Sequence, residues 1–346
     1  MSRLPAALAL VLAVLVPGAG AQSGSDIDLH SHSYCSDGLK NPETVVREAK
    51  AAGLKYFSLT DHDTVACLDR AVATAKEEGL GLIPGIEISA ENGLVHILGL
   101  GIDPSHPALL RLSESMREDR IRWMREVLDV LKKDDVALDE LEDVLLPKWN
   151  AERKADELPS LSLQEVRAMK MSVDGIIGQI HGSVTYTDLK NATVRKGYPQ
   201  ESLKRNMDGH GTNGPGFRES IEMIHQAGGI AILAHPYTIF KFIKKWPVHY
   251  SGKDYHDFES FAADLLAAGL DGFELHRPEW ERYPEDNERM MRIVRGAGRP
   301  LLLSPGSDYH GYPSGAADRT GPPTLGNVRG YPPELQSELL RALGRR

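Results

Sequence analysis

The chain has 346 residues, a formal net charge of −9 and 41% hydrophobic residues. This length fits one α/β barrel with an inserted segment, and the hydrophobic content is sufficient for a large core. The negative charge excludes a fold-wide basic surface for duplex nucleic acid. A small anionic substrate remains compatible with it, because bound divalent ions dominate the local field.

The first 21 residues have the pattern of a cleaved signal peptide. Arg3 provides a short positive region, residues 6–16 are apolar, and the run 19–21 (AGA) matches a small-x-small cleavage site. An uncleaved anchor is less favoured, since this apolar run is too short to cross a bilayer. We therefore expect a periplasmic or secreted protein without a membrane span in its mature chain.

Strands and helices alternate in the region that follows. Asn41 and Pro42 have the residue types that begin a helix, and Gly53 ends it. The alternation implies parallel βαβ units. The predicted helices are 41–52 and 65–78, and the predicted strands are 54–60, 80–89 and 94–101.

The pattern changes between 103 and 214, where a long charged amphipathic helix at 107–133 precedes short helices and polar loops. We interpret 103–214 as an insertion subdomain that covers the site, and 22–102 with 215–346 as the barrel that it interrupts. In the second part of the barrel, the predicted helices are 217–227, 258–268, 285–297 and 334–343, and the predicted strands are 230–234, 272–275 and 301–304.

Histidines and carboxylates occupy or follow the apolar strands, where a parallel α/β barrel places its active site. His30 and His32 are separated by one residue, so both side chains face the same way on an extended chain. Glu87 lies inside an apolar strand, where a carboxylate is costly unless it is paired. These residue types predict a polynuclear metal centre and hence a hydrolase. The candidate metal ligands are His30, His32, Asp37, His62, Glu87, His96, His235, Asp308 and His310.

The order of these motifs (HxH, SDG, TDHD, PGxE, H, AHP and GSDxH) resembles that of the polymerase and histidinol phosphatase (PHP) metal-dependent phosphoesterases. The resemblance covers about 26–102 and 216–328. It implies an α/β fold, a distorted (β/α)7 barrel with a mostly helical insertion, and two to three divalent ions, which are zinc, manganese or iron.

The resemblance also implies how the ligands are shared. Glu87 would bridge two ions. The first ion would also take His30, His32 and Asp308, and the second would take His96 and His310. The third ion would take Asp37, His62 and His235.

The insertion resembles a branch of this family that acts on nucleoside phosphates and RNA ends. That branch has an Arg-x-His element in the insertion and an arginine soon after Ala-His-Pro, whereas this chain has Gln179 and Thr238 there. Arginine binds phosphate in a bidentate manner, so these differences put a nucleotide substrate in doubt. Arg277 is the candidate substrate contact, and Lys241, Lys244 and Lys245 either compensate as well or form a solvated helix face.

Two residues are candidate catalytic groups. His181 is a proton donor or substrate contact in one interpretation and a buried structural histidine in the other. Asp61 either orients the metal ligand beside it or caps a helix. Cys35 and Cys67 are either a disulfide between two loops of the site or two small buried side chains.

Three functional hypotheses follow. The leading one is an exported metal-dependent hydrolase, a phosphoesterase that cleaves a small phosphorylated substrate by attack of a metal-bound hydroxide, without a covalent intermediate. The alternative is a metallohydrolase of carbamate, amide or carboxylic ester bonds, for which the absent arginines would suit a neutral substrate. The third is a non-catalytic metal-binding protein, which would require a defective cluster. The sequence specifies neither the metal, nor the exact substrate, nor the oligomeric state.

Overall fold

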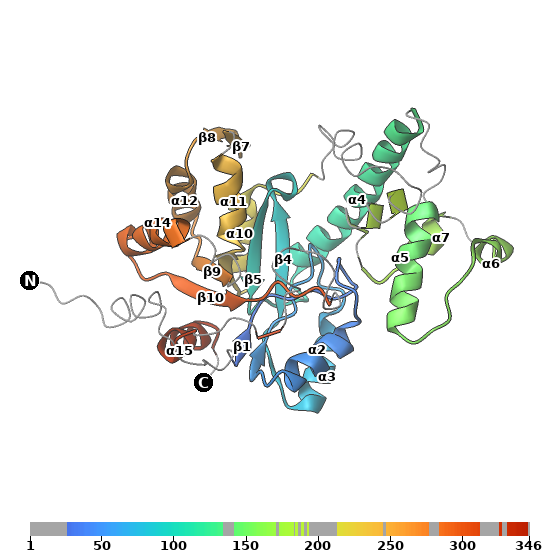
Figure 1. Cartoon of the computed structure of the whole chain (residues 1–346), viewed down its shortest axis with the longest axis horizontal. Coiled ribbons are helices and arrows are strands. Elements are labelled where there is room, and N and C mark those ends of the chain that lie inside the picture. Colours follow the sequence, from blue (N-terminus) through green and yellow to red (C-terminus); the bar gives the residue numbers. More distant parts are fainter. Residues whose placement is uncertain are drawn as a thin grey trace, which may run out of the picture.

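The structure is a computed structural model of the whole chain (Figure 1). It describes residues 26–133, 142–170, 173–182, 184–185, 188–189, 192–193, 213–244, 247–276, 284–311, 325–326 and 331–344. The predicted signal peptide therefore lies outside the described residues, as do Lys245 and Arg277.

Two sheets form the centre of the molecule. A parallel three-stranded sheet has the order β1-β2-β3, and a five-stranded sheet has the order β10-β9-β6-β5-β4. In the larger sheet, β5 runs antiparallel to both of its neighbours, whereas β6, β9 and β10 are parallel. The strand bounds are β1 Ile27–Asp28, β2 Tyr56–Phe57, β3 Gly81–Leu82, β4 Gly85–Ala90, β5 Val95–Leu100, β6 Ile230–Leu233, β9 Gly272–His276 and β10 Leu302–Gly306.

Isolated bridges connect the two sheets. Ser31 pairs with Tyr309 beyond the ends of β1 and β10, and His62 pairs with Glu87. The α/β class is thereby confirmed, but the described strands form no continuous closed barrel. The predicted (β/α)7 barrel is therefore not confirmed. The antiparallel β4–β5 pair interrupts the parallel order, because only the three-residue 3-10 helix η1 (Glu91–Gly93) connects these two strands, which is too short for a parallel crossover.

Helices cover both sides of this centre (Figure 1). Helix α2 begins where Asn41 accepts a hydrogen bond from the amide of Thr44 at 2.7 Å, and α12 begins in the same way at Asp257. The helix bounds are α2 Pro42–Ala51, α3 Leu68–Glu78, α10 Phe217–Gln226, α11 Pro236–Ile243, α12 Phe258–Ala267, α14 Pro284–Gly296 and α15 Pro333–Ala342. No helix among the described residues combines the length and apolar character needed to cross a bilayer.

The insertion has a hydrophobic core of its own. It contains α4 (Pro107–Lys133), α5 (Glu142–Ala155), α6 (Leu163–Ala168) and α7 (Val173–Ile177), which lie to one side of the sheets in Figure 1. Leu109 and Leu112 on α4 pack into the main core, whereas Met124 and Val127 on the same helix pack into the second core. Helix α4 therefore belongs to both cores. The exact boundaries of the insertion stay a prediction.

Most predicted helices agree with the structure to within one or two residues, although α3 begins three residues later than predicted. The predicted strand 80–89 is wrong as a single element, because it consists of β3 and β4, which belong to different sheets. Within the predicted strand 54–60, only Tyr56–Phe57 (β2) pair with a neighbouring strand. The residues after Phe57 leave the sheet and lead into the loop that carries His62. One helix and one hairpin of the second half of the chain were not predicted. Helix α11 begins directly at Pro236, and a hairpin of β7 (Val248–Tyr250) and β8 (Lys253–Tyr255) follows it.

The packing of α12 generates a stability prediction. Phe261 is fully buried and contacts the rings of Phe217 and Tyr250, whose centroids lie 5.7 and 5.1 Å away. We expect Phe261→Ala to lower the free energy of unfolding by about 3–5 kcal/mol through lost contacts and a cavity. Urea denaturation measures this loss. Phe242→Ala is the matched control, since that side chain is 43% exposed, and an equal effect of both variants would contradict the assignment.

Candidate metal centre

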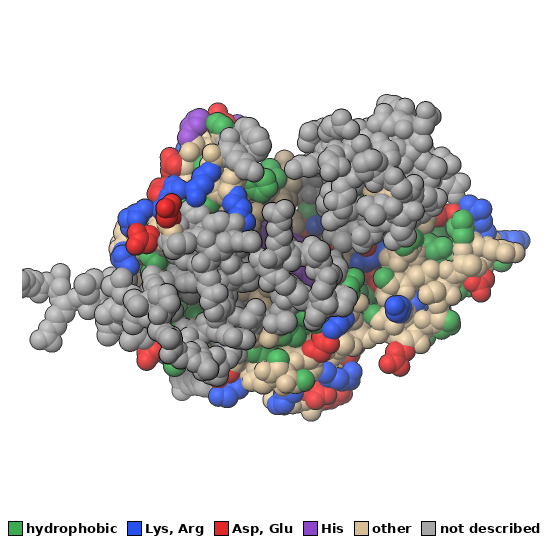
Figure 2. Space-filling model, in the orientation of Figure 1, with side chains coloured by type: hydrophobic (Ala, Val, Ile, Leu, Met, Phe, Trp, Pro, Cys, Tyr) green, Lys and Arg blue, Asp and Glu red, His purple; other side chains and the backbone are tan. Residues whose placement is uncertain are grey.

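The candidate ligands converge from distant parts of the chain. His30 and His32 follow β1, His62 follows β2, Glu87 lies in β4 and His96 in β5. The remaining four come from the turn after β1, the end of β6 and the segment after β10: Asp37, His235, Asp308 and His310. Figure 2 shows histidine side chains near the centre of this face of the molecule.

Three groups of these side chains bring their potential ligand atoms within 4.8 Å of one another. The group around His30 contains three buried residues, more than either other group, and Glu87 belongs to two of the groups. The groups are His30, His32, Glu87 and Asp308; His62, Glu87 and His96; and His32, Asp37, His62 and His310.

The first group fits a divalent cation. The Nε2 atoms of His30 and His32 lie 3.1 Å apart, and both lie 3.1–3.2 Å from the same Oε2 atom of Glu87. Oδ1 of Asp308 is 3.3 and 3.1 Å from the same two nitrogens. Nitrogen and oxygen lone pairs that face one another in a buried space require a proton or a cation between them. Imidazole with carboxylate is a donor set that zinc, manganese and iron accept.

The other oxygen of Glu87 faces His96 of the second group and, beside it, His235. The Oε1 atom of Glu87 lies 3.0 Å from Nδ1 of His96 and 3.1 Å from Nε2 of His235, and these two nitrogens are 3.2 Å apart. Nδ1 of His62 lies 3.3 Å from Oε2 of Glu87. Glu87 thus stands between two sets of imidazoles, as a bridging carboxylate would.

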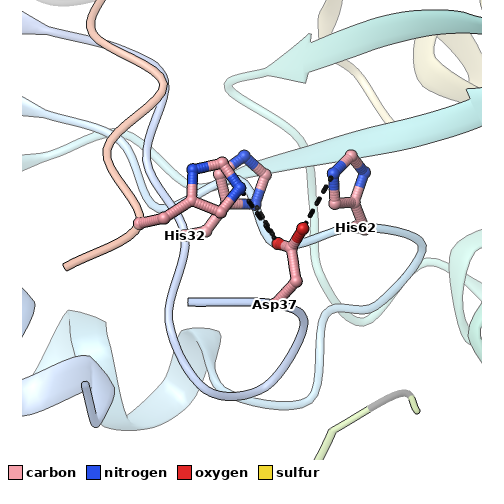
Figure 3. Close-up of side chains that lie close together, drawn as sticks. His32, Asp37 and His62 are labelled. Carbon is pink, nitrogen blue, oxygen red and sulfur yellow. Dashed lines mark ion pairs between the residues drawn. The ribbon is translucent and has the colours of Figure 1, made fainter. Parts of the chain in front are cut away.

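The third group surrounds Asp37, whose carboxylate is directed between His32 and His62 in Figure 3. Its Oδ1 atom is 3.2 Å from Nε2 of His310 and 3.6 Å from Nδ1 of His32, and its Oδ2 atom is 4.0 Å from Nε2 of His62. The grouping differs from the expected one. His310 lies beside Asp37 instead of His96, and His235 lies beside His96 instead of Asp37.

The charges in the centre determine the protonation of its groups. Burial alone would raise the pKa of the Glu87 carboxyl, but His62, His30 and His96 hold this pKa well below its usual value. Burial likewise opposes a charge on His32, yet hydrogen bonds to Asp308 and Glu87 raise its pKa to about 10. The carboxylates are therefore anionic, and protons on His30 and His32 help to balance them. His62 does not share this role, because burial lowers its pKa to about 3. Metal ions and protons compete for such nitrogens.

Two buried carboxylates that the sequence analysis missed support the ligands. Oε1 of Glu274 lies 2.6 Å from Nδ1 of His30, and its Oε2 accepts a hydrogen bond from the amide of His235 at 2.6 Å. Asp28 accepts hydrogen bonds from the amides of Ser307 and Gly326 at 3.0 and 2.8 Å. Glu274 therefore fixes the ring of His30 so that Nε2 faces the centre.

The approach of Glu274 to His30 depends on a glycine. A Cβ atom on Gly306 would lie 1.9 Å from Oε1 of Glu274 and 2.7 Å from Cβ of His30. Any larger residue would displace the carboxylate from the imidazole. Glycine at the end of β10 is thus a requirement of the packing between these two side chains.

Asp61 supports the loop that carries the first ligands. Its Oδ1 atom accepts hydrogen bonds from the amide of Ser33 and the hydroxyl of Ser36, both at 2.7 Å. The Ser36 hydroxyl lies 3.3 Å from Nδ1 of His32. Asp61 therefore orients a ligand through Ser36. The structure caps α3 at Cys67, so the helix-cap interpretation of Asp61 is not the one observed.

A buried ion pair links the insertion to the site. Arg120 on α4 binds the carboxylate of Asp63, and Asp63 accepts a hydrogen bond from the amide of Ser89 at 2.7 Å. Asp63 directly follows the ligand His62, and its side chain is fully buried. The sequence analysis missed this pair, because only the fold brings α4 beside this loop.

The proposed substrate contacts stay predictions. His181 has an exposed side chain whose ring centroid lies 5.9 Å from that of Tyr34, and Gln179 is exposed as well. Thr238 lies in the first turn of α11, where its amide donates a hydrogen bond to the carbonyl of His235 at 3.0 Å. Lys241 and Lys244 are exposed on α11.

Cys35 and Cys67 form a disulfide in the structure, with Cα atoms 6.3 Å apart. This separation lies within the usual range for such bonds. Cys35 lies in the loop between His32 and Asp37, and Cys67 precedes α3. The disulfide therefore connects the loop that carries His32 and Asp37 to the segment that follows His62.

Comparisons with known proteins identify the class. The PHP domain family matches residues 28–193. A 5'-3' exoribonuclease of Haemophilus influenzae is 30% identical over 83% of this chain and 90% of its own length. A 3',5'-nucleoside bisphosphate phosphatase of Chromobacterium violaceum is 42% identical over 30% of this chain and 37% of its own length.

Two solved structures have a similar fold. An amidohydrolase from Chromobacterium violaceum has a TM-score of 0.59 at 24% identity and covers 90% of this chain and 96% of its own. A protein from Bifidobacterium adolescentis has a TM-score of 0.56 at 24% identity, with coverage of 93% and 97%. These two structures show the fold alone. The family match and the sequence relatives, together with the His/Asp/Glu clusters, define a metal-dependent hydrolase that acts on phosphoric esters. The chain belongs to the PHP domain family.

The contact between Glu274 and His30 can be tested directly. We expect Glu274→Gln to weaken metal binding about 10–100-fold, because the amide no longer fixes the ring of His30 as a carboxylate does. Titration of the metal-free protein with zinc or manganese measures the change. Glu259→Gln on the exposed side of α12 is the matched control. Equal affinities for Glu274→Gln and the wild type would refute the orienting role.

The disulfide generates a second prediction. Replacement of Cys35 and Cys67 by serine should lower the free energy of unfolding by about 3–4 kcal/mol, because the unfolded chain gains the freedom of a closed loop. The sequence separation of the two cysteines is 32. Urea denaturation with and without a reductant measures the loss. The reductant should destabilise only the wild type, and a wild type that is indifferent to it would contradict the bond.

Proposed function

We propose that this protein is an exported phosphoesterase that hydrolyses a small phosphorylated molecule with the help of two to three divalent ions. The observation that carries the proposal is the position of Glu87. One buried carboxylate contacts imidazoles on both of its oxygens, and a third group around Asp37 lies next to it. This arrangement suits a polynuclear centre better than a single structural ion.

The ions would be held by nine residues: His30, His32, Asp37, His62, Glu87, His96, His235, Asp308 and His310. Such ions, when bound, activate water as a nucleophile and neutralise the oxygens of a phosphoryl group. Zinc, manganese and iron all suit these donors.

The chain's own residues prepare the site for this chemistry. Glu274 orients His30, and Asp61 with Ser36 orients His32. The side chains of His30, His32 and Glu87 are fully buried, so few water molecules compete with the substrate there. A fixed and partly dehydrated set of dipoles stabilises the transferred phosphoryl group without reorganisation.

Small phosphorylated substrates are supported by the relatives. One is a nucleoside bisphosphate phosphatase, and another, from Eggerthella lenta, is a phosphoribosyl 1,2-cyclic phosphate 1,2-diphosphodiesterase. The amidohydrolase neighbour shares the fold at 24% identity and supplies no argument for amide or carbamate cleavage. We therefore favour phosphoric esters, with the 103–214 insertion as the cover of the site.

Export is supported by two independent features of the chain. The first 21 residues have the composition of a signal peptide. The Cys35–Cys67 disulfide is of a kind that persists in oxidising compartments such as the periplasm. We propose a periplasmic or secreted location on these grounds.

Removal of Glu87 tests the proposal. We expect Glu87→Ala to lose at least one ion per chain and nearly all turnover, because both adjoining groups share this carboxylate. Metal analysis together with a screen of phosphomonoesters and carbamates measures both effects. Glu77→Ala, an exposed position on α3, is the control. A Glu87→Ala protein with unchanged metal content and rate would refute the bridging role, and a wild type that cleaves only carbamates would refute the substrate class.

A further inference from the structure

Helix α5 of the insertion presents two charged residues to a cavity beside the metal centre. Lys148 and Glu152 are four residues apart, so their side chains lie on the same face of the helix. Their side chains are buried, with Lys148 4% and Glu152 1% exposed. Charged residues are almost never buried to this degree without a partner or a function. The sequence analysis did not identify either residue.

The cavity connects these residues to a candidate metal ligand. It has a volume of about 100 Å³, and its lining includes Tyr34, Asp37, Pro147, Lys148, Glu152 and Asp188. A volume of this size accommodates a few atoms of a ligand. Glu152 and Asp37 therefore face the same space, although one comes from the insertion and the other from the loop after β1.

The two carboxylate oxygens of Glu152 differ in their hydrogen bonding. Its Oε2 atom accepts a hydrogen bond from the amide of His181 at 2.9 Å, and the amide of Gly182 is a further donor to the carboxylate. Its Oε1 atom is buried and has no hydrogen-bond partner among the described residues. A buried oxygen without a partner is costly, so such an atom in a native site calls for a ligand or a chemical role.

Close packing fixes the insertion at this point. A Cβ atom on Gly182 would lie 1.9 Å from the carbonyl oxygen of Cys35, so only glycine permits this contact. Lys148 donates a hydrogen bond to the carbonyl of Ser36 in the same loop. Glu152 is therefore positioned relative to the loop that carries Asp37 by contacts on two sides.

The charges around Glu152 favour the protonated carboxyl. Burial raises its pKa to about 7, against the opposing effects of Lys148 and the amide of His181. Lys148 is shared with Asp188, whose Oδ2 atom lies 3.8 Å from Nζ and whose charge also favours the protonated form. Tyr34 faces the group from the loop after β1 and is itself uncharged near neutral pH, since burial raises its pKa. Glu152 can therefore both hold and release a proton near pH 7.

We propose that Glu152 is a catalytic residue that donates a proton to the leaving oxygen of the phosphoric ester in the cavity beside Asp37. The proposal rests on the phosphoesterase function above. Water supplies the oxygen of the new bond to phosphorus, and the bond from phosphorus to the leaving oxygen breaks. The leaving oxygen keeps the electron pair of that bond and takes the proton of Glu152. The attacking water releases a proton to the solvent, and the carboxylate of Glu152 takes up a proton from the solvent, so the enzyme returns to its starting state.

The neighbours of Glu152 suit both stages of this step. Before the transfer, Oε1 is the oxygen that can carry the proton, because it has no other partner among the described residues. After it, the ammonium of Lys148 and the amide of His181 stabilise the carboxylate, since both lower its pKa. A proton donor with a pKa near the working pH is the most effective one.

Leaving-group dependence tests the proposal. Wild type and Glu152→Gln, each loaded with metal, are compared on a series of substituted phenyl phosphates. We expect the variant to lose about 100-fold on esters of weakly acidic phenols, and a much smaller factor on p-nitrophenyl phosphate, whose leaving group needs little help. The variant's rate therefore depends more steeply on leaving-group basicity. An equal loss on every ester would overturn the proposal and leave Glu152 a structural residue.

The pH profile gives a second measurement. With a weakly acidic phenol, the wild-type rate should fall as the pH rises through about 7, because the carboxyl loses the proton that it must donate. This fall should be absent in Glu152→Gln. In Lys148→Met the fall should move to higher pH, because this variant lacks the positive charge that lowers the pKa of Glu152. If Glu152→Gln does not fold, the shift in Lys148→Met tests the proposal by itself. A fall that persists unchanged in either variant would contradict the role of Glu152.

Two controls separate this role from other effects. Glu118→Gln, an exposed position on α4, should behave as the wild type throughout. The metal content of Glu152→Gln should equal that of the wild type, because Glu152 belongs to none of the ligand groups, and a loss of metal would overturn the assignment. If the wild type cleaves no phosphoric ester, the proposed function itself is wrong. If the wild type cleaves these esters but the Glu152 variants show none of the expected changes, only the role of Glu152 is wrong.

Discussion

The structure depends on the buried carboxylate of Glu87, which would be unstable without positive charge or hydrogen-bond donors close to it. Glu87 is enclosed within β4, and imidazoles face both of its oxygens. Desolvation of such an anion costs several kcal/mol unless opposite charge is close. The convergence of histidines from β1, β2, β5 and β6 supplies this compensation, and the antiparallel β4–β5 pair brings His96 to the same place. The fold and the site are therefore parts of one electrostatic arrangement.

The candidate ligands are held in place by residues from the sheets, from the loops and from the insertion. Glu274 and Asp61 act on the rings or loops of His30 and His32, and Gly306 leaves the space that Glu274 needs. The insertion adds the Arg120–Asp63 pair and the α5 contacts. The insertion thus lies directly against the loops that carry the candidate ligands.

The sequence predicted most of the candidate ligands because short motifs place them directly after strands, where parallel strands share an edge. Glu87 and His96 lie inside the antiparallel strands β4 and β5, and Glu87 was predicted as a carboxylate within an apolar run. The sequence predicted α4 to the residue, since the amphipathic pattern is long. Glu274 was missed although it has the same signal as Glu87, a carboxylate inside an apolar strand. The grouping of His235 and His310 could not be derived, because ring positions depend on the relative depth of β6 and β10. Lys148 and Glu152 were missed because only the folded chain brings them to residues more than a hundred positions away.

The participation of α4 in both hydrophobic cores has a mechanical consequence. A helix of 27 residues is about 40 Å long, so a small tilt at one end becomes a displacement of several ångströms at the other. Arg120 lies near its midpoint and is anchored at Asp63. A shift of the loop that carries His62 and Asp63 would therefore move both ends of α4, one packed in the main core and the other in the core of the insertion.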